Sequence, residues 1–233
     1  YCGIDLHSNN SVISLIDKED KVIKENRLAN DFDLIEKYLA PFQDNIEGIV
    51  VESTYNWYWL VDGLVDKGYP VHLANTLAIQ QYNGIKHTND ETDARFLAHL
   101  LRLDILPTGF IYPKAMRYVR DVLRRRLLMV KQSVAQLLSL QSLISRHTGK
   151  QLTSQKVKQL TAENLSNYLH DTSALFSARQ SLQLWQQLQQ QISDIEIFVL
   201  SKCTKEDFSI ITSTPGIGKI LGMTILMETG PIE

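Results

Sequence analysis

The early part of the chain alternates short apolar stretches with polar turns, a pattern typical of a mixed α/β domain. Periodicity and turn residues predict strands at 1–7, 11–16 and 21–28, a helix from Asn30 or Asp31 to Leu39, a strand at 46–52, a helix at 56–67, a strand at 69–73, and a helix from beyond Asn89 to about Leu103. Pro107 and Pro113 then indicate a linker. The order βββαβαβα predicts a mixed sheet, in which three antiparallel strands precede alternating units.

From Lys114 onward the apolar residues follow a helical period instead. One stripe recurs every seventh residue, with Leu127 and Val134 added to it: Met116, Leu123, Val130, Leu137 and Ile144. A second stripe steps by three and four: Trp185, Leu188, Ile192, Ile195 and Val199. Both predict coiled-coil seams in two long helices that share one interface, within one chain or across a dimer. Thr148 and Gly149 should end the first helix, and 150–176 is expected to be a polar, broken connection.

The last segment contains a glycine-rich turn, residues 214–219, followed by an apolar helix over about 220–227. Such a turn exposes backbone N–H groups at a helix N-terminus, where a phosphate can bind. Gly216, Gly218 and Lys219 are therefore candidate nucleic-acid contacts, and a purely structural turn is the alternative. These divisions predict three parts, namely 1–110, a helical arm at 111–208, and the start of a further domain at 209–233.

Charge is distributed unevenly, although the net charge is only −2. Residues 1–113 carry −8, residues 114–158 carry +10, and residues 159–233 carry −4. An acidic domain followed by a basic helix suits a nuclease-like protein, because carboxylates bind metal ions and Lys/Arg surfaces meet phosphate. A solvated helix face is the alternative explanation. The candidate phosphate contacts are Lys86, Arg117, Arg120, Arg124, Arg125, Arg126 and Lys131.

Other features of the composition limit the possible classes of protein. No continuous apolar stretch has the length of a membrane span, so no membrane partner is expected. Cys2 and Cys203 lie far apart without a partner motif, which argues against a disulfide framework and a zinc site. We therefore expect a cytoplasmic protein. The chain begins without methionine, and we expect it to be part of a longer protein.

Four carboxylates form the strongest candidate site. Asp5 interrupts an apolar strand, Glu52 ends another, and Asp90 and Asp93 lie one helical turn apart. The strand order is that of ribonuclease-H-like domains, in which the first and fourth strands are neighbours, so the four should converge. Oxygen ligands of this kind favour Mg²⁺ or Mn²⁺, and two such ions support phosphodiester chemistry.

Each of these acids also has a structural explanation. Asp5 would accept hydrogen bonds from the turn at 8–11, Glu52 would pair with Lys86, and Asp90 would cap its helix. The aromatic residues after Glu52 would stack on a nucleobase, but at helical spacing most of them belong in the core. These aromatic residues are Tyr55, Trp57, Tyr58 and Trp59.

Four motifs in order resemble the DEDD transposases of bacterial insertion sequences, which are related to Piv-type invertases and include bridge-RNA-guided recombinases. The motifs are Gly3-Ile4-Asp5-Leu6-His7, Val51-Glu52-Ser53-Thr54, Lys86 followed by Asp90, Asp93 and Ala94, and Pro215-Gly216-Ile217-Gly218 with Glu228-Thr229-Gly230 after it. The resemblance implies a RuvC-like domain whose four acids bind the metal ions. It also implies a helical arm for self-association as a homodimer or higher oligomer, DNA as a partner and, in some members, a structured guide RNA.

The sequence departs from this family at two places. Thr76 stands after Asn75 where many relatives have proline. The family also places a serine nucleophile beyond the glycine-rich turn, and no serine of this chain matches that position, so we expect the catalytic unit to be incomplete here.

Two other classes of protein remain open at this point. A sugar-kinase or actin-like ATPase shares the Gly-Ile-Asp-Leu strand but needs a glycine-rich phosphate hairpin, whereas residues 8–11 contain no glycine. A non-catalytic coiled-coil scaffold would bind nucleic acid through Arg124, Arg125 and Arg126 without any convergence of the four acids.

Overall fold

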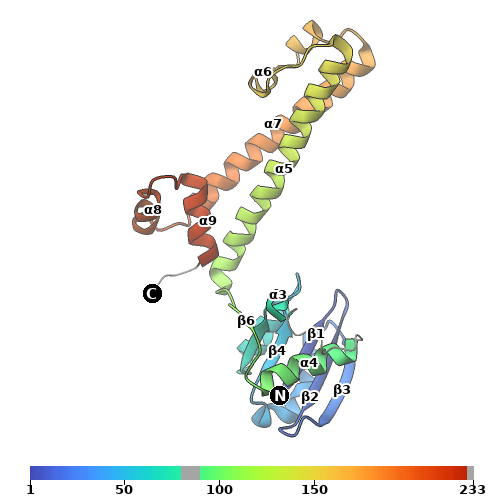
Figure 1. Cartoon of the computed structure of the whole chain (residues 1–233), viewed down its shortest axis with the longest axis vertical. Coiled ribbons are helices and arrows are strands. Elements are labelled where there is room, and N and C mark those ends of the chain that lie inside the picture. Colours follow the sequence, from blue (N-terminus) through green and yellow to red (C-terminus); the bar gives the residue numbers. More distant parts are fainter. Residues whose placement is uncertain (80–89, 230–233) are drawn as a thin grey trace. The chain divides into compact units, whose positions relative to one another are not determined.

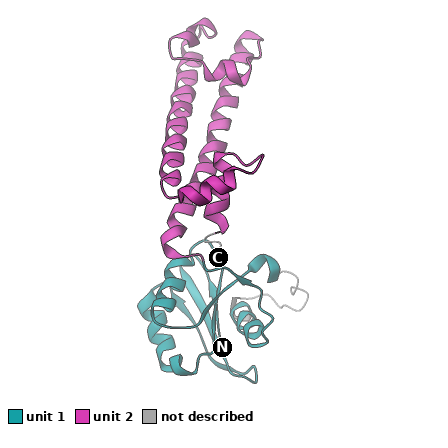
Figure 2. Cartoon of the chain, turned by 90° about the vertical axis from the view of Figure 1, so that its left-hand side faces the viewer, with its two compact units in different colours: residues 1–111 teal, residues 112–233 magenta. Residues whose placement is uncertain are grey.

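The chain folds into two compact units, residues 1–111 and 112–233 (Figure 2). The computed structural model describes residues 1–79 and 90–229, with the backbone alone at 90–92. The first unit ends between Pro107 and Pro113, and the predicted division into a domain at 1–110 and an arm at 111–208 stays a prediction. Residues 209–229 lie within the second unit, and their assignment to the start of a further domain stays a prediction.

The first unit is built on a six-stranded mixed sheet of order β3-β2-β1-β4-β5-β6. Its strands are β1 Cys2–Leu6, β2 Asn10–Ile16, β3 Val22–Ala29, β4 Ile49–Glu52, β5 Val71–Ala74 and β6 Thr108–Gly109. β1 pairs antiparallel with β2 and parallel with β4, so the mixed sheet and the adjacency of the first and fourth strands are confirmed. The ribonuclease-H-like assignment of this sheet stays a prediction.

Strand β6 was not predicted from the sequence, and it pairs antiparallel with β5 through only two residues. Its two residues, Thr108 and Gly109, carry no apolar alternation, and Pro107 precedes them. A strand this short is held by backbone hydrogen bonds to its neighbour, which leave no pattern in the side chains.

Three helices of the first unit begin and end close to the expected residues: α1 Phe32–Leu39, α2 Tyr58–Asp66 and α4 Asp90–Arg102. The 3₁₀ helix η1 Ala40–Asn45 and the short helix α3 Thr76–Ile79 were not predicted. The Asp31 carboxylate accepts hydrogen bonds from the backbone N–H groups of Asp33 and Leu34, so it caps α1 as expected. Gly68 follows α2 with a φ of 83°, a conformation that glycine adopts without strain.

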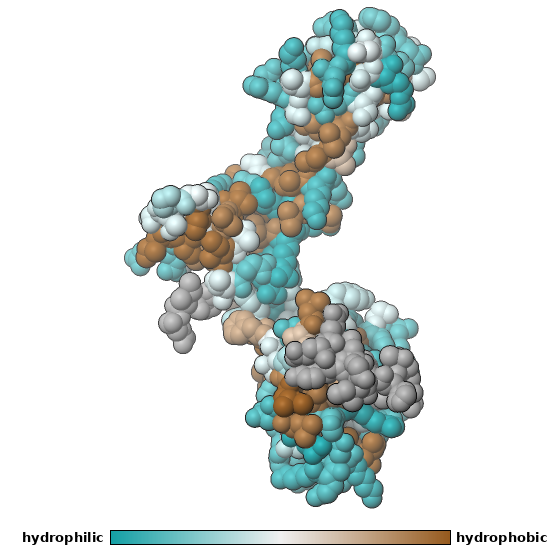
Figure 3. Space-filling view, in the orientation of Figure 1, coloured by the Kyte–Doolittle hydropathy of each residue, from teal (hydrophilic) through white to brown (hydrophobic). Residues whose placement is uncertain are grey.

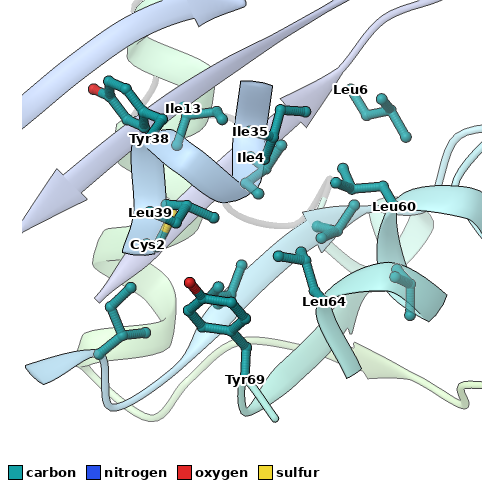
Figure 4. Packing of buried hydrophobic residues seen from close by; sticks show 14 of the residues in the cluster. Cys2, Ile4, Leu6, Ile13, Ile35, Tyr38, Leu39, Leu60, Leu64 and Tyr69 are labelled. Atoms are coloured by element: carbon teal, nitrogen blue, oxygen red, sulfur yellow. The ribbon is translucent and has the colours of Figure 1, made fainter. Parts of the chain in front are cut away.

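The two faces of the sheet bury different helices. Cys2, Ile4 and Leu6 of β1 point to the face covered by α1 and α2 (Figure 4). Val50 of β4 lies on the opposite face, where it packs against Leu97 and Leu100 of α4. Since successive residues of a strand alternate between faces, Gly3, Asp5 and Glu52 lie on the α4 face.

Two long helices form most of the second unit, and they run antiparallel, side by side (Figure 1). Its helices are α5 Lys114–Thr148, α6 Ser154–Lys158, the 3₁₀ helix η3 Asn164–Asn167, α7 Thr172–Leu200, α8 Lys205–Thr212 and α9 Lys219–Thr229. Leu123 shares one apolar cluster with Val199, and Ile144 shares another with Ala174. The predicted interface between the two stripes is therefore confirmed, and it forms within one chain; supercoiling of the pair stays a prediction.

The buried stripe of α5 differs from the predicted one at its edges. Leu127 and Val134 are 55% and 50% exposed, so their placement in the seam is wrong. Ser133 and Leu140 are buried instead, and the Gln189 amide donates to Ser133 Oγ at 2.6 Å. Leu127 and Val134 each lie four residues after a residue of the seven-residue stripe, whereas Ser133 and Leu140 lie three residues after one, so the second line of the seam follows the step of three.

The connection between the two long helices is shorter and more apolar than expected. Thr148 ends α5, as predicted, and Gly149 follows with a φ of 66°. α7, however, begins at Thr172, capped by Asp171, so the predicted polar stretch 150–176 is wrong at its end. Five apolar side chains of the connection lie in the core of the helix pair: Leu152, Val157, Leu160, Leu165 and Leu169. Their irregular spacing gives no periodic signal.

Helices α8 and α9 pack against the ends of α5 and α7. Met223, Leu226 and Met227 of α9 lie in one apolar cluster with Leu123 and Val199, and the Tyr112 hydroxyl donates to the Met227 carbonyl. Apolar surface remains over α8 and α9 (Figure 3). Ile210 and Leu221 belong to this exposed part of the two helices.

Among the described helices, α5 alone is apolar and long enough to cross a membrane by length and composition. One helix of this kind is weak evidence for a membrane span. Its apolar residues do not form a continuous stretch, because Gln132, Gln136 and Gln141 interrupt them. The absence of a membrane partner stays a prediction.

The seam of α5 can be tested with two leucines that lie two residues apart. Leu140 is 2% exposed and Leu138 is 53% exposed. We expect Leu140→Ala to lower the free energy of unfolding of the second unit by about 2–5 kcal/mol, because it leaves a cavity. Leu138→Ala, the matched control, should change it by less than about 0.5 kcal/mol. Urea unfolding followed by Trp185 fluorescence measures both, and equal losses would contradict this assignment of the seam.

Candidate active site and basic surface

Asp5 and Glu52 lie at the ends of neighbouring parallel strands. Ile4 is paired with Val51 in the β1–β4 ladder, and the two acids follow directly after this pair. Neighbouring strands lie about 4.8 Å apart, and both side chains point to the α4 face. Asp5 is 4% exposed and Glu52 is half-buried. The strand order therefore places two carboxylates side by side at one edge of the sheet.

Helix α4 brings its N-terminal end toward the same edge. A Cβ on Gly3 would meet the Ala94 carbonyl oxygen and would lie 2.8 Å from Ala98 N, and a Cβ on Gly48 would lie 3.0 Å from Leu101. Gly48 precedes β4, where its carbonyl accepts from Cys2 N. Helix α4 therefore runs opposite to β1 and β4. Its first turn, which contains Asp93, lies toward Asp5 and Glu52.

Ion pairs to the β2–β3 hairpin hold α4 in this direction. The Arg95 guanidinium donates twice to the Glu25 carboxylate, at 2.6 and 2.7 Å. These hydrogen bonds hold the pKa of Glu25 below its usual range. At the other end of α4, His99 Nδ1 lies 2.8 Å and Arg102 Nε 3.3 Å from the same oxygen of Asp20. α4 is thus fixed along its length, and with it the position of Asp93.

His7 lies directly over Asp5, with Nε2 3.3 Å from the Asp5 Oδ2 atom. Two amides fix its backbone, since Asn30 Nδ2 and Asn56 Nδ2 donate to the His7 carbonyl at 2.9 and 3.0 Å. Asn30 in turn accepts from Ser11 Oγ at 2.7 Å. The loops after β1, β3 and β4 therefore meet at the His7 carbonyl. This carbonyl lies beside the strand ends that carry Asp5 and Glu52, here called the acidic edge.

Only part of the predicted metal site can be described. Lys86 and the side chain of Asp90 lie outside the described residues. Among the side chains of residues 1–79 and 93–229, no group of three His, Cys, Asp or Glu is arranged to hold a metal ion. The structure thus places Asp5 and Glu52 on neighbouring strands, and the first turn of α4, which contains Asp93, at the same end of the sheet. Their role as metal ligands stays a prediction.

Arg117 does not belong to the predicted basic surface. It is 2% exposed, and its Nε and Nη2 atoms donate to the Tyr112 carbonyl at 3.2 and 2.8 Å. A buried guanidinium that serves a backbone carbonyl is not accessible to a phosphate, so the assignment of Arg117 as a nucleic-acid contact is corrected. Its function here is to hold the chain that enters α5.

Three other arginines of the run face carboxylates of their own chain. Arg124 donates to both oxygens of Glu228, at 2.7 and 2.6 Å, and these bonds hold the pKa of Glu228 below its usual range. Arg120 lies over the Tyr112 ring, 4.3 Å from its centroid, with Nη1 3.9 Å from Glu228. Arg126 donates to Glu196 at 2.8 Å. These pairs attach α9 and α7 to α5, which the sequence did not indicate.

Arg125 and Lys131 are exposed on α5, and the part of the chain that the structure describes contains no ion pair to either. They are the members of the predicted set that remain directly accessible to phosphate. Arg120, Arg124 and Arg126 would have to exchange a carboxylate for a phosphate, which reduces the net gain of each contact.

The glycine-rich turn joins α8 to α9. Gly216 has a φ of 90°, a left-handed conformation that favours glycine. A Cβ on Gly218 would meet nothing within 4 Å, so packing does not require glycine there. Lys219 begins α9, with Nζ 3.7 Å from Glu196. The helix N-terminus is exposed, as a phosphate contact needs, and this role of Gly216, Gly218 and Lys219 stays a prediction.

The two cysteines are free thiols among the described residues. Burial raises the pKa of the Cys2 thiol to about 12, which keeps it protonated and unreactive at neutral pH. Cys203 lies in the other unit. Neither contributes to the acidic edge.

Comparison with known families places this architecture among the DNA-transposing enzymes. A family model of IS110-type DEDD transposases matches residues 2–148, which include the whole sheet, α4 and α5. The chain therefore belongs to the IS110-type DEDD transposase family, as the resemblance of its motifs indicated. Comparison with curated proteins gives no significant match.

Gly3 provides a test of how α4 is placed. We expect Gly3→Ala to lower the free energy of unfolding of the first unit by about 1–3 kcal/mol, because the added Cβ meets the Ala94 carbonyl oxygen, which must move away. Gly218→Ala is the control, since its Cβ would meet nothing. Chemical denaturation followed by fluorescence of Trp57 and Trp59 measures the change. Unaltered stability of Gly3→Ala would show that α4 does not approach β1 this closely.

Proposed function

We propose that the first unit carries the metal-dependent strand-cleavage site of a DNA transposase or recombinase, with Asp5, Glu52, Asp90 and Asp93 as ligands of Mg²⁺ or Mn²⁺. The observation that supports this most directly is the placement of Asp5 and Glu52 at adjacent parallel strand ends on one face. Two carboxylates so placed repel each other unless a cation offsets their charge. The donors are all oxygens, which suits Mg²⁺ and Mn²⁺ better than zinc.

Each part of the site has a separate task in this proposal. Asp5 and Glu52 hold fixed positions because their strands are paired on both sides. In this proposal α4 supplies Asp93 as a further ligand, and the His7 ring shields the buried Asp5 carboxylate from one side. Divalent ions bound there would activate the attacking oxygen and stabilise the leaving oxygen of a phosphodiester. The serine that the family uses as nucleophile matches no position of this chain and is not assigned.

The second unit supplies the nucleic-acid surface in this proposal. Membership of a transposase family makes DNA the partner of the protein, and the accessible Arg125 and Lys131 of α5 are suited to its phosphates. The proposal also includes a structured guide RNA and a homodimer or higher oligomer, which the family resemblance implies. It further includes a cytoplasmic, nucleoid-associated location.

The two other classes of protein gain no support from the structure. A phosphate hairpin of the ATPase type needs a glycine-rich turn after β1, but residues 7–10 form a tight turn in which His7 N donates to the Asn10 carbonyl at 2.9 Å. A scaffold without catalytic activity would have no reason to place Asp5 beside Glu52. Neither is proposed.

The metal site can be tested with isosteric substitutions. We expect Asp5→Asn and Glu52→Gln to weaken Mn²⁺ binding by at least about tenfold and to abolish strand cleavage by the complete protein. DNA binding should stay unchanged or become slightly tighter, because each change removes a negative charge. Electron paramagnetic resonance of Mn²⁺ measures the first effect and a cleavage assay the second.

Asp44→Asn is the matched control, since Asp44 is an exposed acid of the same unit. It should behave as the unaltered protein in all three measurements. Mn²⁺ binding that does not depend on Asp5 or Glu52 would refute the assignment of the metal site.

The basic surface can be tested through the salt dependence of DNA binding. Replacing Arg125 and Lys131 by Ala should flatten the slope of log affinity against log salt by about 1.4–1.8, the sum for two phosphate contacts. Lys21 and Lys67, replaced together by Ala, form a control of equal charge change on exposed residues of the first unit. An unchanged slope for the Arg125 and Lys131 variant would show a solvated helix face.

A further inference from the structure

Tyr55 is exposed, unlike the aromatic residues that follow it. Its side chain is among the most exposed apolar groups of the described residues, at 83%, whereas Trp57 is buried in the core of the first unit at 7%. The Trp57 ring meets Tyr58 edge-on at a centroid distance of 4.7 Å. Helical spacing predicted that most of these aromatic residues lie in the core. Tyr55 is the member that needs another explanation.

The loop that carries Tyr55 is held on both sides of it. Thr54 N donates to the Glu52 carbonyl at 2.9 Å, and Thr54 Oγ1 donates to Asn56 Oδ1 at 2.8 Å. Asn56 Nδ2 then donates to the His7 carbonyl at 3.0 Å. Because its neighbours are fixed, Tyr55 is presented outward from a rigid turn. An exposed ring on a rigid loop loses little entropy when a ligand covers it.

This turn lies at the acidic edge of the sheet. Tyr55 follows Glu52 by three residues, so its Cα lies within about 11 Å of the Glu52 Cα. His7, whose carbonyl anchors the turn, also lies over Asp5. A ligand on the Tyr55 ring is therefore within reach of the proposed cleavage site, about three nucleotide steps of 3.4 Å or fewer along a strand.

We infer that Tyr55 stacks on an unpaired nucleobase of the DNA strand, next to the phosphate held at Asp5 and Glu52. The inference rests on the proposed function and adds to it a contact that touches substrate. Divalent ions at Asp5 and Glu52 would hold one phosphate of the strand but would leave the base beside it without a contact. A base stacked on a tyrosine ring gives such a contact, and it accepts any base because every base has an aromatic face.

The experiment uses short single-stranded DNA that carries one 2-aminopurine, whose fluorescence is quenched on stacking, at successive positions. The unaltered protein, Tyr55→Phe and Tyr55→Trp should quench it at one position, and Tyr55→Ala should not. An abasic site there should weaken binding by the unaltered protein by about 5- to 150-fold. Tyr55→Ala should weaken binding of the intact strand equally, and the two losses should not add. Since Tyr55 is exposed, the variants should keep the circular dichroism and thermal unfolding of the unaltered protein.

Phe176→Ala is the matched control, because Phe176 is also an exposed aromatic residue, 67% exposed, but lies on α7 of the second unit. It should leave the quenching intact. Equal losses for Tyr55→Phe and Tyr55→Ala would overturn stacking in favour of the hydroxyl group. An effect confined to single-stranded RNA, or none at all, would overturn the inference as well.

A further variant separates failure of this inference from failure of the proposed function. Asp5→Asn should lose Mn²⁺ while keeping the quenching of 2-aminopurine. Metal loss in Asp5→Asn with no effect of Tyr55→Ala would overturn the stacking alone. Unaltered Mn²⁺ binding in Asp5→Asn would overturn the proposed function, and with it the place of Tyr55 beside a cleavage site.

Discussion

The close approach of helix α4 to strand β1 determines the geometry of the first unit. Gly3 has no side chain, so the backbone of α4 at Ala94 and Ala98 lies directly on the strand. This contact fixes the height of the helix above the sheet, and the ion pairs of Arg95, His99 and Arg102 with the β2–β3 hairpin fix its direction. Because α4 runs opposite to β1 and β4, its acidic first turn reaches the strand ends where Asp5 and Glu52 lie.

Hydrogen bonds between neutral groups also hold the acidic edge in position. The His7 carbonyl accepts from Asn30 and Asn56, which come from different loops. A single acceptor thus ties together the ends of β1, β3 and β4, and it holds the His7 ring beside Asp5. The same bonds fix the turn that presents Tyr55. One shared network therefore positions both the proposed catalytic carboxylate Asp5 and the ring of Tyr55, which would lower the cost of ordering them for reaction.

In the second unit, the basic run of α5 is largely used by the fold, which limits its proposed role in binding phosphate. Arg117 is buried and donates to a backbone carbonyl of its own chain. Arg120 and Arg124 pair with Glu228 of α9, and Arg126 pairs with Glu196 of α7. The positive charge of α5 is therefore partly neutralised by carboxylates of the same unit. The positive charge that remains directly accessible, on Arg125 and Lys131, is smaller than the charge that the sequence indicates. A phosphate bound by Arg120, Arg124 or Arg126 would have to displace a carboxylate. If these arginines bind nucleic acid as proposed, stability of the helix pair and affinity for nucleic acid are linked through them.

Local patterns in the sequence were sufficient for most elements of the fold. Asp31 and Gly149 determined where helices begin and end, and alternation determined the order and pairing of the first strands, because these signals act over a few residues. The motif around Asp5 and Glu52 likewise indicated the family.

Other features were decided only by the tertiary structure. The burial of Arg117, the exposure of Leu127 and Val134, and the pairing of β6 depend on partners far away in the chain. The same holds for Tyr55, whose exposure among buried aromatic residues follows from the turn that Asn56 anchors to His7. Residue type and spacing specify which elements form, whereas the side chains left accessible on them are set by long-range packing, which a one-dimensional pattern does not contain.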